Sequence, residues 1–188
     1  MYVAMDCEER RLFESFVNCS RRYLEFGVGG STWLACSRPK EWALSIDSDS
    51  KWLDTVQRNL SECPTQPTMI RADIGPVKEW GYPVDESNRS LWPAYHEQVW
   101  QRTESPNADF FLVDGRFRVA CAIQCVLHCQ PTAFIAVHDY SDRPHYHVIA
   151  KFLREVASAN RLSVFLREPG LDQSAATEVL AQYSCNPA

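Results

Sequence analysis

Five short, mostly apolar segments, each with an ionisable residue at or beside its C-terminal end, constrain the fold of this chain most. They cover about residues 22–26, 42–46, 68–72, 109–113 and 133–137, and longer segments with helical character separate them. This alternation predicts an α/β fold, in which a mostly parallel sheet carries helices on both faces and forms three layers. The carboxyl ends of parallel strands share one edge of a sheet, and open α/β sheets bind their ligands there.

The residues that end these segments are therefore candidates for one functional site. We expect nearly all of the ionisable side chains at the strand ends to lie along that edge of the sheet. They are Glu25, Asp47, Asp73, Asp114, and the pair His138 and Asp139.

The remaining segments give a coarse map of a single domain over residues 1–188. An insertion rich in Trp and Pro at about 75–107 has the length of a lid or a small substructure. Residues 162–166 are predicted to form a last strand, and the secondary structure of residues 168–188 is ambiguous from the sequence. Apolar spacing predicts helices over about 6–19, 31–37, 50–60, 93–102, 118–129 and 146–159.

The turn after the first segment is rich in glycine. Gly27, Gly29 and Gly30 permit a tight strand-to-helix turn and a close approach of a ligand to the backbone. The pattern lacks the last glycine of a dinucleotide fingerprint, and no Gly-Lys-Ser/Thr indicates a P-loop. Glu25 at its head would disfavour a pyrophosphate but suit a cationic amino-acid ligand. Asp47 follows the glycines by about 20 residues, the spacing at which an acid binds ribose hydroxyls.

Together these residues resemble those of class I S-adenosylmethionine-dependent methyltransferases over about residues 20–166. The resemblance implies a Rossmann-like methyltransferase fold with S-adenosylmethionine as cofactor. It implies that the glycine turn holds the methionine part, that Asp47 holds the ribose, and that Ala72 and Asp73 lie at the adenine. The cofactor-binding set is then Glu25, Gly27, Gly29, Gly30, Ser31, Thr32, Asp47, Ala72, Asp73 and Asp114, although many members have glycine where Ser31 stands.

The chemical step is expected at Asp114, Arg116, His138 and Asp139, which follow adjacent strands if the strand order is that of the family. Methyl transfer needs an oriented nucleophile and often a base, and His138 titrates near neutrality. Asp114 or Asp139 could orient His138.

A divalent metal is the less favoured alternative. Catechol O-methyltransferase-like members bind one through an Asp after the fourth strand and an Asp-Asn pair after the fifth. Asp114 matches the first position, but His138 and Asp139 stand at the pair, and Mg²⁺ prefers oxygen ligands. A softer metal would accept all three residues.

Two roles remain open for the arginines near these strand ends, which are Arg116, Arg118 and Arg143. They can bind a carboxylate or phosphate of the substrate, or they can form salt bridges with the neighbouring acids. The acceptor is accordingly expected to be a small molecule, with an anionic one among the options.

Charge and composition narrow the class of partner. The net charge of −5 gives no basic excess for nucleic acid, and no apolar run approaches the roughly 20 residues that span a bilayer. The N-terminal residues do not resemble a secretory signal, so we expect a cytoplasmic protein with neither nucleic acid nor membrane as partner.

Three functions remain. A methyltransferase acting on a small molecule leads, and a non-catalytic relative that binds a cofactor or a protein partner is the alternative. A nicotinamide-dependent oxidoreductase is disfavoured by Glu25 and by the incomplete glycine pattern.

Overall fold

The computed structural model describes all residues from Met1 to Ala188 and contains one seven-stranded sheet in the order β3-β2-β1-β4-β5-β7-β6. Strand β7 runs antiparallel to its neighbours β5 and β6, and the other neighbouring strands pair in parallel. The predicted mostly parallel sheet is confirmed. The strands are β1 (Arg22–Phe26), β2 (Trp42–Asp47), β3 (Thr68–Arg71), β4 (Phe110–Val113), β5 (Phe134–Val137), β6 (Leu153–Ala159) and β7 (Leu162–Arg167).

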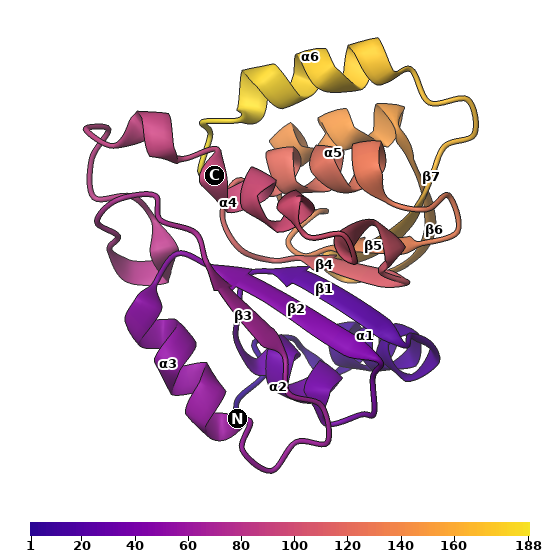
Figure 1. Ribbon diagram of the computed structural model, residues 1–188. Coiled ribbons are helices and arrows are strands. Elements are labelled where there is room, and N and C mark those ends of the chain that lie inside the picture. Colours follow the sequence, from indigo (N-terminus) through magenta and orange to yellow (C-terminus); the bar gives the residue numbers. More distant parts are fainter.

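Helices cover both faces of the sheet, which gives the expected three layers (Figure 1). One face carries α1 (Cys7–Cys19), α2 (Gly30–Cys36) and α3 (Ser50–Asn59), and the other carries α4 (Ala94–Glu97), α5 (Arg118–His128) and α6 (Gln173–Tyr183). None of these helices combines the length and apolar character needed to cross a bilayer.

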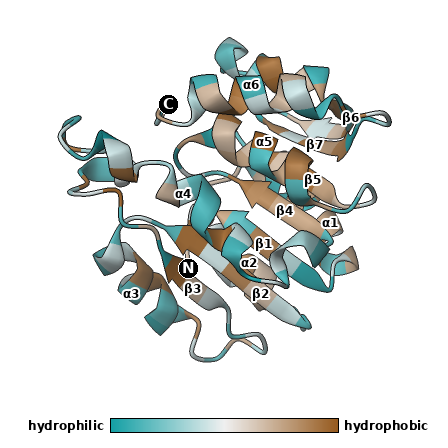
Figure 2. Cartoon of the chain, turned by 45° about the horizontal axis from the view of Figure 1, so that its top comes forward, coloured by the Kyte–Doolittle hydropathy of each residue, from teal (hydrophilic) through white to brown (hydrophobic).

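Alternation along the central strands builds two apolar cores. Phe110 and Leu112 of β4 pack with the residues of α1, α2 and α3, whereas Phe111 and Val113 pack with those of α5. Figure 2 shows the apolar colour concentrated on these central strands. A strand buried on both faces has to be apolar throughout, as this segment is.

The helix expected over 146–159 is wrong. Residues Pro144–Lys151 form a 3₁₀-helix, and β6 follows from Leu153 to Ala159. The segment has helical apolar spacing, but it turns back at Asn160 and pairs antiparallel with β7. Strand pairing with a neighbour overrides local propensity in such segments.

The insertion at 75–107 consists mainly of short turns. It contains the 3₁₀ turns Glu79–Gly81, Arg89–Leu91 and Ser105–Asn107, and the helix expected over 93–102 appears as α4 continued by a 3₁₀ turn, Gln98–Gln101. Tyr95 and Trp92 are buried against Phe117, at ring-centroid distances of 5.5 and 5.9 Å. The insertion therefore packs beside α5 and reaches the carboxyl edge of the sheet.

Candidate functional site

The chain order of the sheet reverses at β1, which pairs with both β2 and β4. The loops after β1 and β4 touch at this switch point, where open α/β sheets bind ligands. The amide nitrogens of Asp114 and Gly115 both donate to the carbonyl oxygen of Phe26, at 2.9 and 2.8 Å. A Cβ atom on Gly27 would lie 2.6 Å from the Cα atom of Gly115, and the φ angle of Gly27 is +98°. Glycine is required at this position.

Two further glycines of the turn have opposite surroundings. A Cβ atom on Gly29 would meet nothing within 4 Å, so open space lies beside the loop at the start of α2. A Cβ atom on Gly30 would lie 2.6 Å from the Cα atom of Val3, because the N-terminal segment packs over that position. Gly29 is thus the point at which a ligand can approach the loop.

Glu25 lies beneath the loop, with none of its surface exposed. Burial raises its pKa to about 7, although hydrogen bonds from Thr32 and other hydroxyls oppose the shift. Its carboxylate accepts from Ser45 (2.7 Å), Tyr23 (2.9 Å) and Ser31 (3.0 Å). Thr32 also accepts from the amide of Gly29, at 2.9 Å. Glu25, Ser31 and Thr32 therefore stabilise the loop from below.

Asp47 holds the glycine turn from the side of β2. Its carboxylate accepts from the amides of Val28 (3.0 Å), Ser48 (2.7 Å) and Asp49 (3.1 Å), and burial raises its pKa against these bonds. A carboxylate has about four acceptor positions, so one remains for a hydroxyl of a ligand.

The two residues expected at an adenine lie at the end of β3. The carboxylate of Asp73 is exposed and accepts from the amide of Gly75 at 3.1 Å. Ala72 is buried in the core. Asp73 can thus contact a ligand with its side chain, and Ala72 with its backbone.

His138 lies between two carboxylates at the ends of β4 and α1. Its Nδ1 atom is 3.1 Å from Asp114 and its Nε2 atom is 3.3 Å from Glu9. Burial lowers the pKa of His138, but the carboxylates of Asp114, Asp139 and Glu9 outweigh it and raise the pKa above 6.5. Both ring nitrogens therefore already have a carboxylate partner within hydrogen-bond distance.

Asp139 receives three guanidinium groups. Arg118, Arg143 and Arg161 lie 3.0, 3.1 and 3.2 Å from its carboxylate oxygens. Arg118 also lies 3.2 Å from Asp114, so a guanidinium bridges the two aspartates that the metal alternative requires. The structure contains no group of three or more His, Cys, Asp or Glu side chains arranged to hold a metal ion.

Arg116 differs from its neighbours because it makes no ion pair. The residue is 7% exposed, and its Nε and Nη1 atoms are buried without a hydrogen-bond partner. Its guanidinium stacks on the ring of Tyr82, 4.1 Å from the centroid. Burial raises the pKa of Tyr82, but Arg116 and Arg143 outweigh it, and the net shift is downward from 10.0.

Two residues of this region, Glu9 and Arg161, were missed by sequence reasoning. Glu9 and Arg161 form a two-bond ion pair, with Nε–Oε1 at 3.0 Å and Nη2–Oε2 at 3.1 Å, and Tyr82 faces Arg116 from the insertion. Asp6 and Glu9 form a capping box at the start of α1, a pattern that is visible in the sequence. That pattern predicts where the helix starts, but not that Glu9 lies beside His138.

Backbone strain accompanies the candidate site. Trp80, Phe117 and Asp139 have φ angles of +62°, +55° and +58°, in the left-handed region that side chains disfavour. All three lie in segments at the carboxyl edge of the sheet. Such strain concentrates where function requires a fixed geometry.

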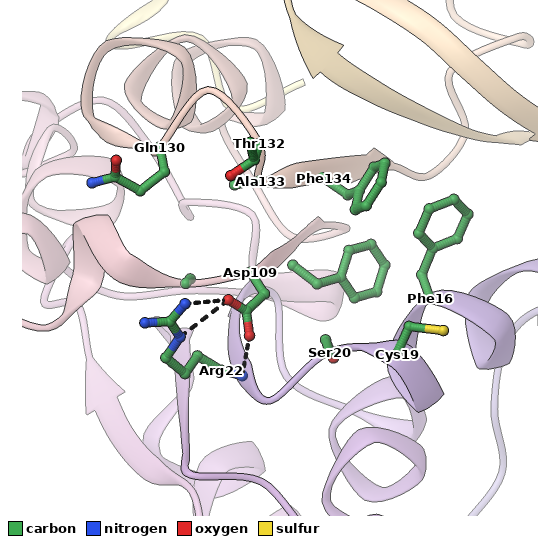
Figure 3. A pocket seen from close by; sticks show the side chains of 11 residues that line it. Phe16, Cys19, Ser20, Arg22, Asp109, Gln130, Thr132, Ala133 and Phe134 are labelled. Atoms are coloured by element: carbon green, nitrogen blue, oxygen red, sulfur yellow. Dashed lines mark hydrogen bonds and ion pairs between the residues drawn. The ribbon is translucent and has the colours of Figure 1, made fainter.

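A hollow of about 130 Å³ lies at the opposite edge of the sheet (Figure 3). It is lined by Phe16, Phe110 and Phe134 and by the ion pair of Arg22 with Asp109, whose closest atoms are 2.5 Å apart. This edge holds the amino ends of β1, β4 and β5. The hollow is therefore separate from the edge at which α/β sheets bind ligands.

No protein-family model matches the sequence, and no curated protein matches it at a significant level. Solved structures do match. A methyltransferase-like protein from Silicibacter pomeroyi DSS-3 is 28% identical, with a TM-score of 0.91 over 99% of this chain and 98% of that one.

More distant structures share the fold. The N-methyltransferase NodS from Bradyrhizobium japonicum WM9, solved with S-adenosyl-L-homocysteine, is 11% identical, with a TM-score of 0.56 over 88% of this chain and 90% of that one. An rRNA methylase from Streptococcus thermophilus is also 11% identical, with a TM-score of 0.58 over 88% of this chain and 100% of that one. In its strand order and glycine turn, the chain resembles class I S-adenosylmethionine-dependent methyltransferases, whose fold it shares.

Proposed function

We propose that this chain is an S-adenosylmethionine-dependent methyltransferase that acts on a small-molecule acceptor. One observation carries the proposal: the switch-point edge combines open space at Gly29, a spare acceptor position on Asp47 and unpartnered buried donors on Arg116 and Ser48. These groups fit a ligand that has hydroxyl groups and an anionic end.

The residues present fit the cofactor. The backbone from Gly27 to Gly30 would hold its methionine part, Asp47 its ribose hydroxyls, and Ala72 with Asp73 its adenine. When bound, the cofactor supplies a methyl group on a sulfonium centre.

The chain's own side chains then orient the acceptor and handle its proton. Asp114 and Asp139 are already bound by guanidinium groups and His138, so they fix the geometry of this edge. Tyr82 Oη stands beside His138 as a group that can handle the acceptor's proton, because Arg116 and Arg143 lower its pKa from 10.0 against the effect of burial.

Charge supports a small acceptor over a nucleic acid. The fold serves an rRNA methylase as well as an N-methyltransferase, so the fold does not choose between acceptors. The net charge of −5 disfavours a phosphate backbone. All eight cysteines are free, as is usual in proteins of a reducing compartment.

Calorimetry with S-adenosylhomocysteine tests the cofactor assignment. We expect a micromolar dissociation constant for the native chain and no binding of NAD. Asp47→Ala should weaken binding by about tenfold or more, the size of a lost hydrogen bond to a charged group. Asp54→Ala removes the same charge from the outer part of α3 and should bind like the native chain. Equal affinities in all three proteins would contradict the ribose role of Asp47.

A non-catalytic relative is the second candidate, because the ionisable groups Asp114, His138 and Asp139 are saturated by one another and by arginines. A screen of small acceptors that follows release of S-adenosylhomocysteine separates the two. Cofactor binding with no transfer to any acceptor, and no effect of Tyr82→Phe on any measured property, would favour the non-catalytic function.

A further inference from the structure

We propose that Arg116 binds an anionic oxygen group, a carboxylate or a phosphate, of a small molecule at the carboxyl edge of the sheet. The inference rests on the proposed function for the identity of that molecule. The anion site itself is argued from the contacts of Arg116.

Arg116 is the arginine of this region that forms no ion pair. Arg118 and Arg143 each pair with Asp139, and Arg161 pairs with both Glu9 and Asp139. Arg116 is nine-tenths buried and has neither an ion pair nor a partner for Nε and Nη1. A buried guanidinium without an acceptor is strongly disfavoured, so these two nitrogens favour an acceptor from outside the chain.

A second unpartnered donor lies beside Arg116. The hydroxyl of Ser48 is buried without a partner, and both side chains border Gly81 of the insertion. From the position of a Cβ atom on Gly81, Ser48 Oγ is 3.4 Å away and Arg116 Cγ is 3.7 Å away. Ser48 and Arg116 therefore both lie within van der Waals distance of the same turn of the insertion.

The stacking on Tyr82 orients the guanidinium. Tyr82 covers one face of Arg116, so the nitrogen edge is the part that can bind. A planar guanidinium edge matches a carboxylate or a phosphate, which it can bind through two parallel hydrogen bonds. The stacked ring therefore selects an anion approaching in the plane of the guanidinium.

Two carboxylates lie near Arg116, and both are already engaged. Asp47 Oδ1, which is 4.0 Å from the Gly81 Cβ position, accepts from the amides of Ser48 and Asp49. Asp114, whose pKa is lowered mainly by Arg118 and His138 against its burial, faces those two groups. Neither carboxylate forms an ion pair with Arg116, so its guanidinium is available to an anion from outside the chain.

The anion that Arg116 binds can belong either to an anionic acceptor or to the carboxylate of the cofactor's methionine part. Two ligands distinguish these two alternatives. S-adenosylhomocysteine carries the amino-acid carboxylate, and 5′-methylthioadenosine has the same nucleoside without it. Inorganic phosphate serves as a simple probe for an anion that belongs to neither.

The test compares the native chain with Arg116→Gln and Arg116→Met, the second of which keeps length and packing if the first is poorly folded. Arg10→Gln, on the exposed side of α1, removes an equal charge far from the site. Calorimetry gives the affinities of the native chain and the variants for both nucleosides. Thermal unfolding in phosphate is compared with unfolding in chloride, with and without S-adenosylhomocysteine. The difference in melting temperature measures the response to the anion.

We expect phosphate to raise the melting temperature of the native chain and of Arg10→Gln but not of the Arg116 variants. If the variants bind S-adenosylhomocysteine about tenfold or more weakly and 5′-methylthioadenosine normally, the anion is the cofactor's carboxylate. If nucleoside affinities are unchanged and the phosphate response of the complex is lost, the anion bound by Arg116 belongs to the acceptor.

Unchanged affinities together with an unchanged phosphate response would overturn the proposal. A native chain that binds neither nucleoside would refute the proposed function instead, and the phosphate measurement without nucleoside would still test the anion site.

Discussion

The side chain of His138 lies between Asp114 and Glu9, and its protonation therefore contributes to the stability of the fold. The carboxylates overcome the effect of burial and raise its pKa above 6.5. A group whose folded pKa is raised stabilises the fold below its unfolded pKa, and this contribution is lost as pH rises through the folded pKa.

His138→Gln should therefore lower the free energy of unfolding most at mildly acidic pH. The difference from the native chain should shrink as pH rises above 6.5. Urea unfolding at a series of pH values measures it. His145→Gln, near the surface on the 3₁₀-helix, should cause no loss at mildly acidic pH, because burial and Arg143 lower the pKa of His145. A difference that grew with pH would mean that His138 is neutral in the folded state.

Glu9 has none of its surface exposed and anchors α1 to the other end of the chain. It accepts from the backbone amide and the guanidinium of Arg161 as well as from His138. Glu9→Ala should destabilise the protein by about 3 kcal/mol, near the lower end for removing one partner of a buried ion pair, because Arg161 is partly exposed.

Glu8→Ala is the matched change for that experiment, since Glu8 is exposed on the same turn of α1. It should cost less than about 1 kcal/mol. Urea unfolding compares the two variants. Similar losses in both would show that the buried contacts of Glu9 contribute little.

At the scale of elements, the 3₁₀ turn Glu79–Gly81 places a strained and exposed aromatic side chain above the candidate site. Trp80 has a φ angle of +62° and is 83% exposed, so it has little packing to lose. Trp80→Gly should raise the free energy of unfolding by about 1 kcal/mol, because glycine adopts this conformation without the steric penalty.

The same variant should weaken binding or turnover of the acceptor if the strain is retained for function. Asn160→Gly is the control, since Asn160 also has a positive φ angle, +46°, but lies in the hairpin turn between β6 and β7. It should change stability slightly and leave ligand binding unaltered. If Trp80→Gly and Asn160→Gly changed ligand binding or turnover equally, the strain at Trp80 would have no specific role in function.

Elements whose burial pattern is uniform could be predicted from the sequence, and β6 could not. Strands β1, β2, β4 and β5 are mostly apolar runs with polar ends, because each lies inside the sheet. β6 lies at the edge, its exposed residues alternate only in part, and Glu155–Ala157 interrupts its register with a bulge. An irregular edge strand leaves a weak period-2 pattern, and the helical spacing from Tyr146 to Val156 then dominates.

At the scale of the whole molecule, the candidate site joins segments that no local pattern connects. Glu9 comes from α1, Tyr82 from the insertion, Asp114 and Asp139 from the two central strand ends, and Arg161 from the hairpin. Strand periodicity predicts the shared edge of the sheet, and therefore Asp114, His138 and Asp139. The contributions of α1, the insertion and the hairpin depend on packing over long separations in the chain, which periodicity does not encode.

The free cysteines report on the opening of the whole fold. Cys7 and Cys19 are exposed, whereas Cys121 and Cys125 are buried in the core and Cys129 beside them has a pKa raised by burial to about 11. Thiols react as thiolates, so the α5 cysteines are protected both by burial and by protonation. A thiol reagent should label Cys7 and Cys19 rapidly and the α5 cysteines only through unfolding.

Labelling followed by mass spectrometry measures these rates, with urea-unfolded protein as the fully reactive control. S-adenosylhomocysteine should slow labelling of Cys121 and Cys125 in proportion to its concentration above the dissociation constant, because a ligand of the folded state reduces the unfolded fraction. It should leave Cys7 and Cys19 unaffected, since their reaction needs no opening. If the α5 cysteines reacted as fast as Cys7 in the native protein, local opening of α5 would replace global unfolding as the path to them.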